Sequence, residues 1–142
     1  MSQLYLQAVV HNRSLRSLRD LRAEHVPMLR DIITQAEKLA EKYGLERGTV
    51  RCWVHYQPVS TVTESKYHTD KALQSYYHFH VHIMHIGCES SSRNISLDDI
   101  IDNLEIFSAI EETSGLGFYQ KKTLTYELGA KHGLFDALWQ AQ

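Results

Sequence analysis

The chain has 142 residues, of which 43% are hydrophobic and 23% charged, and its formal net charge is −2 with neutral histidine. This length suits one domain with its own core, and the weak charge argues against a protein that binds duplex nucleic acid through its phosphates. No stretch is long and apolar enough to span a bilayer, and two cysteines without metal-type spacing fit reduced thiols. We therefore expect no membrane contact and a location in the cytoplasm, the nucleus or both.

The first half of the chain predicts a strand, a long helix and a second strand. The apolar run Leu4–Val10 is typical of a buried strand. Apolar residues then recur three and four apart over Ala23–Tyr43, which is the period of an amphipathic helix, and Gly44 follows as a helix stop. The stretch Thr49–Gln57 predicts the second strand.

The second half predicts two strands and two helices. Tyr76–Ile86 is rich in aromatic and β-branched residues and predicts a third strand. Ser96–Phe107 begins with capping-box spacing and predicts a short helix. Lys122–Leu128 alternates as a half-buried strand does, and Gly133–Gln142 predicts a closing helix. Because helices do not regularly separate the strands, the order indicates a single α+β domain with an antiparallel sheet.

Four of the nine histidines lie between His78 and His85, three of them at alternate positions. On a strand, Tyr76, His78, His80 and His82 would share one face and leave the other face apolar. A solvated strand face is one interpretation, and a metal site is another, although no Asp or Glu lies in the motif to orient the ligands. Nucleophilic attack of a neutral imidazole on phosphorus, with neighbouring rings orienting the phosphate, gives every ring of the series a role.

The segment "HFHVHIM" matches the histidine-triad signature, in which three histidines alternate with apolar residues. The blocks "LYLQAVVHNRSLRSLRDL", "VHYQP", "SYYHFHVH", "IIDNLE" and "QKKTLTYEL" extend the likeness through nearly the whole chain. Together they resemble the C-terminal catalytic domain of the scavenger mRNA decapping enzymes, within the histidine triad superfamily. The resemblance implies an antiparallel sheet with a long helix, a short helix and a C-terminal helix, and a homodimer.

The resemblance also implies a reaction and its residues. His80 would be the nucleophile, attacking the phosphate next to 7-methylguanosine in a capped dinucleotide or short capped RNA and forming a nucleotidyl-histidine. Water would then release 7-methylguanosine monophosphate and leave the other nucleotide as a diphosphate, with no metal or cofactor. A backbone carbonyl near His78 would hold the His80 ring. The implied contacts to phosphate are His82, His55, Ser75, Tyr76 and Arg93.

The sequence departs from this family after Pro58. Sixteen extra residues, 59–74, separate "HYQP" from "SYYHFH", and their removal would restore the family spacing. A surface loop is one interpretation, since extra loop length costs little entropy. A retained in-frame intron is the other, because the segment starts with Val-Ser and ends with Gln, residues whose codons can match splice-site sequence. Sequencing the transcript separates the two.

The family's N-terminal cap-binding domain is absent from these 142 residues. Aromatic stacking and charge contacts select the methylated base, so we expect weaker cap selectivity. A truncated or inactive paralogue that binds nucleotides, or a dimeric scaffold, therefore remains as an alternative to a cap diphosphatase.

Overall fold

The computed structural model describes residues 4–56, 78–88 and 94–125, and within these ranges four antiparallel strands form one sheet. The strands are β1 (Tyr5–Val9), β2 (Val50–His55), β3 (His80–His85) and β4 (Asn94–Ser96), in the spatial order β1-β3-β2-β4. The strand β3 is therefore central, with β1 and β2 hydrogen-bonded on either side of it. The predicted antiparallel α+β class is confirmed.

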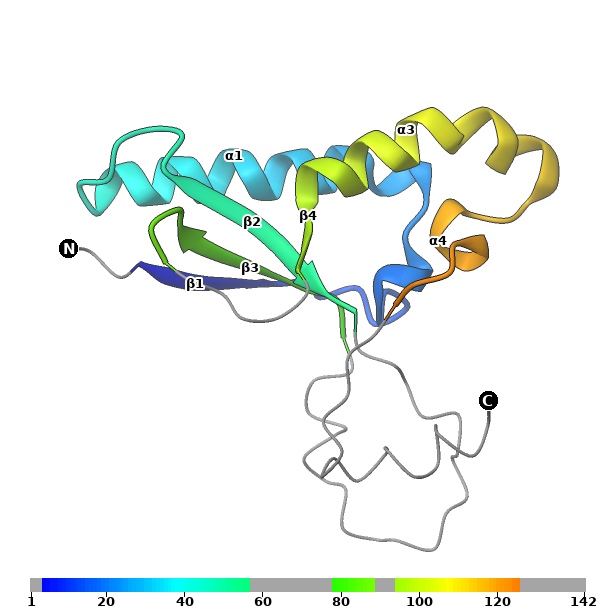
Figure 1. Cartoon of the computed structure of the whole chain (residues 1–142), viewed down its shortest axis with the longest axis horizontal. Helices are drawn as coiled ribbons and strands as arrows, with labels where there is room; N and C mark the ends of the chain where they lie inside the picture. Colours follow the sequence, from blue (N-terminus) through cyan, green and yellow to red (C-terminus); the bar gives the residue numbers. More distant parts are fainter. Residues whose placement is uncertain (1–3, 57–77, 89–93, 126–142) are drawn as a thin grey trace, which may run out of the picture.

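Two long helices, α1 (Val26–Lys42) and α3 (Leu97–Ser114), lie on the same side of the sheet (Figure 1). Shorter helical pieces are η1 (Leu18–Asp20), η2 (Ala23–His25) and α4 (Phe118–Lys121). None of the helices in the described part of the chain is long and apolar enough to cross a membrane. Buried side chains fill the space between the helices and the sheet, among them Leu29, Ala36, Cys52, Val54, Val81, Ile83, Leu97, Ile100 and Leu104.

The first predicted helix begins three residues later than its apolar period indicates. Residues Ala23–His25 form the 3₁₀ turn η2, and α1 starts at Val26. This start places Pro27 in the first turn, where an amide donor has no helical partner to lose. The helix ends before Gly44, whose φ of 79° is a left-handed conformation that glycine adopts without strain.

The third predicted strand is shorter than expected. The strand starts at His80 instead of Tyr76, and His78 lies in a bend before it, while Tyr76 itself lies outside the described residues. Phe79 explains the difference, because its amide donates to the Leu15 carbonyl and its carbonyl accepts from Val10. These bonds tie the chain to the loop after β1 before regular pairing begins.

The short helix predicted over Ser96–Phe107 was wrong in length. Ser96 caps the helix by accepting the Asp98 amide, but α3 continues to Ser114 and ends at Gly115. Beyond Leu104 the helix buries no side chain fully, and after Ile110 no apolar residue continues the period to its end. A hydrogen bond to a distant part of the chain helps hold this extension, because the Glu111 carboxylate accepts the Ala23 amide at 3.2 Å.

The strand predicted over Lys122–Leu128 is not present in its described part. Residues 122–125 have no regular structure, since the Lys122 amide donates to the Phe118 carbonyl and closes α4. The sequence had not indicated α4. The remainder of this predicted strand, and the closing helix Gly133–Gln142, lie outside the described residues.

Candidate active site

The face of the sheet away from α1 and α3 gathers imidazoles from two strands. Within β3, Val81 and Ile83 point to the helices, so His80 and His82 lie on the opposite face. The pairing of Trp53 with His82 brings β2 into register, so that Trp53 and His55 share this face. Strand alternation and register thus assemble rings that are 25 or more positions apart along the sequence.

His80 is held by a backbone carbonyl. Its Nδ1 lies 3.0 Å from the carbonyl oxygen of His78, with the two rings 6.0 Å apart between centroids. A carbonyl can only accept, so Nδ1 of His80 carries the proton and donates it. The lone pair of the neutral ring is then on Nε2, which is the form a nucleophilic imidazole needs.

His82 is the most enclosed ring of the group, with only 7% of its surface exposed. Trp53 stacks on it at 4.2 Å and an interplanar angle of 10°, and the rings of His55 and His80 meet it edge-on at 4.7 and 5.0 Å. Burial, with smaller contributions from His55 and His80, lowers the pKa of His82 from 6.5 to about 4. His82 is therefore a neutral ring near neutral pH.

Two buried nitrogens on this face have no partner among the described residues, Nε2 of His82 and Nε1 of Trp53. Buried polar groups are nearly always hydrogen-bonded in folded proteins, so each unpaired nitrogen marks a place where a partner is expected. Both belong to the stacked pair, so the two nitrogens without a partner among the described residues lie side by side on the imidazole face of the sheet.

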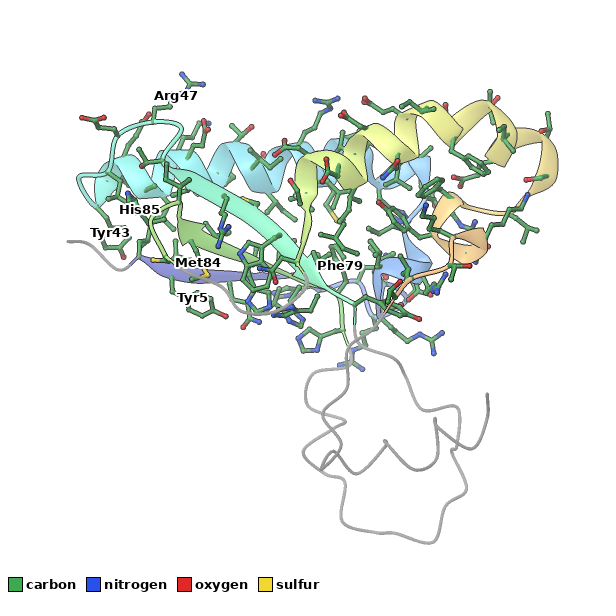
Figure 2. All side chains as sticks on the ribbon, in the orientation of Figure 1. Tyr5, Tyr43, Arg47, Phe79, Met84 and His85 are labelled. Atoms are coloured by element: carbon green, nitrogen blue, oxygen red, sulfur yellow. The ribbon has the colours of Figure 1, made fainter. Side chains whose placement is uncertain are left out.

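Sequence reasoning missed Tyr5. Its hydroxyl oxygen lies 2.6 Å from Nδ1 of His82, and Figure 2 shows the side chain on the face of the sheet away from α1. Tyr5 pairs with Met84 in the sheet, so it is the diagonal neighbour of His82. The sequence predicts both strands but not that β1 is next to β3, and so it carries no signal for this contact.

The remaining predicted residues divide into two groups. His55 is partly buried and joins the cluster, with its ring 4.4 Å from Trp53. The predicted phosphate contacts Ser75, Tyr76 and Arg93 lie outside the described residues.

His85 lies on the other face of β3, where its Nδ1 accepts the Gly87 amide at 3.1 Å, so it stands apart from the cluster. Across the described ranges, no group of three or more His, Cys, Asp or Glu side chains is arranged to hold a metal ion.

A separate pocket of about 480 Å³ lies between α3, α4 and β4. Its lining includes Asp99, Asp102, Tyr119 and Lys122 but none of the histidines. The imidazole chemistry is therefore not located in this pocket.

The fold and the site together define an α+β domain whose sheet carries, on the face away from the helices, a cluster of imidazoles with one ring held by a carbonyl. Comparison with known families adds that a family model described as "Scavenger mRNA decapping enzyme C-term binding" matches residues 1–97. The chain belongs to the scavenger mRNA decapping enzyme C-terminal family.

Relatives named "m7GpppX diphosphatase" support the assignment. The protein of Homo sapiens is 34% identical over 147 aligned positions, which cover 100% of this chain and 36% of that protein. The protein of Ascaris suum is 34% identical over 87% of this chain and 35% of its own length, and that of Schizosaccharomyces pombe 31% identical over 97% and 40%. The chain thus spans little more than a third of the length of these relatives.

Proposed function

We propose that this chain is the catalytic part of a cap diphosphatase, acting on 7-methylguanosine cap dinucleotides or short capped RNA fragments. The observation that carries the proposal is the bond from His80 Nδ1 to the His78 carbonyl, which leaves the Nε2 lone pair for attack. The name shared by the relatives, m7GpppX diphosphatase, supports the choice of substrate. We propose one catalytic domain over residues 1–142, with 59–74 as an insertion in it.

The proposed reaction has two displacements at one phosphorus atom. Nε2 of His80 attacks the phosphate attached to 7-methylguanosine, forming an N–P bond as the bond to the bridging oxygen breaks. The second nucleotide leaves with that oxygen as a diphosphate. Water then attacks the same phosphorus, the N–P bond breaks, and 7-methylguanosine monophosphate leaves with the water oxygen while its proton passes to solvent or a phosphate oxygen.

The neighbouring imidazoles are proposed as hydrogen-bond donors to the transferring group. We assign His82 and His55 to phosphate oxygens, because both rings lie in edge contact beside the nucleophile or its neighbour. Neutral donors aimed at developing negative charge are an effective source of transition-state stabilisation. The family resemblance adds Ser75, Tyr76 and Arg93 to the phosphate contacts.

The test compares His80→Asn with His85→Asn on m7GpppG. The first substitution should reduce kcat on the order of 10⁴-fold while binding persists, since it removes the nucleophile only. The second should leave kcat within about twofold, because His85 lies on the opposite face. Full activity of His80→Asn would contradict the proposed nucleophile.

A second measurement asks for the intermediate directly. The wild-type chain, quenched in base during turnover, should carry 7-methylguanosine monophosphate on His80, because a phosphoramidate survives base and hydrolyses in acid. Binding of m7GpppG without turnover would support an inactive paralogue, and neither binding nor turnover would support a scaffold.

We also propose that the chain forms a homodimer and acts in the cytoplasm, the nucleus or both. The exposed side chains Ile106 and Ile110, one turn apart on α3, are 81% and 48% exposed and offer apolar surface for pairing. Light scattering on the purified chain should give twice the mass of one copy, and Ile106→Lys should lower it if α3 contributes to the interface. A monomer at every concentration tested would refute the dimer.

A further inference from the structure

The contact between Tyr5 and His82 defines the hydrogen-bonding state of the most buried imidazole. The hydroxyl oxygen and Nδ1 are 2.6 Å apart, which is a short hydrogen bond between two groups that can each donate or accept. A phenol is a strong donor and a poor acceptor, whereas the unprotonated nitrogen of a neutral imidazole is a strong acceptor. The favoured arrangement is O–H···Nδ1, with the hydroxyl as donor.

This arrangement fixes the proton of His82 on Nε2, because a neutral imidazole carries one N–H. His80 has the opposite tautomer, since its Nδ1 donates to the His78 carbonyl. Two rings 5.0 Å apart therefore present different groups at Nε2, a lone pair on His80 and an N–H on His82. A nucleophile beside a neutral donor suits phosphoryl transfer, because the donor can stabilise the negative charge of the transferring group.

The surroundings of His82 hold the ring in place for this role. Trp53 stacks on one face of the ring, and Nε2 has no partner among the described residues although the atom is buried. The N–H that Tyr5 favours at this position is thus a donor without an acceptor among the described residues. If Nδ1 of His82 instead carried the proton, Nε2 of His82 would carry a lone pair, as Nε2 of His80 does. That lone pair would repel a phosphate oxygen.

We propose that Tyr5 is a positioning residue, whose hydroxyl holds His82 in the Nε2–H tautomer so that the ring donates to an oxygen of the transferring phosphate. The inference rests on the proposed function for the identity of that phosphate group. It extends the site to β1, which the histidine motif does not include. Tyr5 acts through His82 and does not itself have to touch the substrate.

The tautomer is measurable without any substrate. Long-range ¹H–¹⁵N correlation spectra of the histidine side chains in the full chain should show Nδ1 of His82 as an unprotonated nitrogen and Nε2 as a protonated one. Tyr5→Phe keeps the ring, removes the hydroxyl, and should convert His82 to a mixture of tautomers while His80 is unchanged. A protonated Nδ1 in the wild type, or the same single tautomer in the variant, overturns the inference.

Kinetics on m7GpppG give the second readout. Tyr5→Phe should lower kcat about tenfold, the effect of one lost hydrogen bond, with KM changed less than about twofold. Tyr43→Phe is the matched control, because this tyrosine is also exposed and lies at the end of α1, outside the cluster. Wild-type kcat in Tyr5→Phe, or a loss confined to KM, argues against positioning.

The two proposals fail in different ways. A wild-type chain without turnover on any capped substrate overturns the proposed function, and the tautomer spectra then decide the role of Tyr5 by themselves. Turnover that His80→Asn abolishes but Tyr5→Phe leaves intact preserves the proposed function and removes Tyr5 from it.

Discussion

His82 combines a hydrogen-bonded ring nitrogen with almost complete burial. Burial disfavours the imidazolium, and the neighbouring rings of His55 and His80 disfavour it further. The hydroxyl of Tyr5 can donate a hydrogen bond to Nδ1 of the neutral ring. The residue is therefore suited to donate a hydrogen bond without carrying charge.

This environment makes folding sensitive to mild acid. In the unfolded chain His82 takes up a proton near its ordinary pKa of 6.5, but in the folded chain only near 4. Between these values the unfolded chain holds more protons, so the free energy of unfolding falls as the pH is lowered through this window. At about pH 5 the loss from His82 is roughly 2 kcal/mol relative to neutral pH.

Urea unfolding of the wild type and His82→Gln at neutral pH and at about pH 5 measures this contribution. The variant lacks the titrating ring, so its free energy of unfolding should change by roughly 2 kcal/mol less between the two conditions. Equal changes in both proteins would show that His82 keeps an ordinary pKa in the folded state.

At the scale of elements, the segment "RSLRDL" connects parts of the fold that are distant in sequence. Ser17 and Asp20 form a capping box around η1, and Arg19 extends from it to the end of β2 and to α4. Its Nε donates to the Tyr56 hydroxyl at 3.2 Å, its guanidinium lies over that ring, and Nη1 donates to the carbonyls of Tyr119 and Lys122.

Substitution of Arg19 by Met should therefore destabilise the domain. It retains most of the aliphatic stem but removes charge-assisted hydrogen bonds to three acceptors, and we expect a loss of about 2 to 3 kcal/mol in the free energy of unfolding. Arg13→Met is the control, because Arg13 is exposed in the turn that precedes η1, and it should change stability by less than about 0.5 kcal/mol. Thermal unfolding of both variants tests this, and equal melting temperatures would contradict the role of Arg19.

The same elements show what the sequence could predict. The apolar period of Ala23–Tyr43 located α1 to within a few residues, and runs of apolar and β-branched residues located β1 and β2. The strand β1 is not buried on both faces as expected, because Tyr5 and Val9 are exposed on the face away from the helices. Individual backbone hydrogen bonds account for the other differences from the prediction. Those of Phe79 make β3 start later than expected, and that of Lys122 closes α4 where a strand was expected. The imidazoles of β3 could be placed on one face from alternation alone, whereas Tyr5 depends on strand order, which a period does not encode.

At the scale of the whole molecule, the two faces of the sheet differ in composition. The side that α1 and α3 cover (Figure 1) carries the apolar core with Val81 and Cys52. By strand alternation, the other side carries His80 and His82. Substitutions on the imidazole face should therefore change the proposed activity without opening the core. A measurement that depends only on whether the core is closed is needed to distinguish loss of activity from loss of folding.

The two cysteines allow that measurement. Cys52 is buried in the core, and burial, reinforced by the charges of Asp98 and Glu37, raises the pKa of its thiol from 9.0 to about 11. Cys88 is partly exposed and also free. Because the thiolate is the reactive form, a thiol reagent such as DTNB near pH 8 should label Cys88 quickly and Cys52 only when the core opens.

The native chain should thus show one fast thiol and one slow thiol, and Cys88→Ser should abolish the fast phase alone. Adding urea below the unfolding midpoint should accelerate the slow phase in proportion to the opening of the core. Tyr5→Phe and His80→Asn, which act on the opposite face, should leave the slow phase within about threefold of the wild type, whereas Arg19→Met should accelerate it more than about tenfold. Fast labelling of both thiols in the folded chain would show that Cys52 is not enclosed by the core.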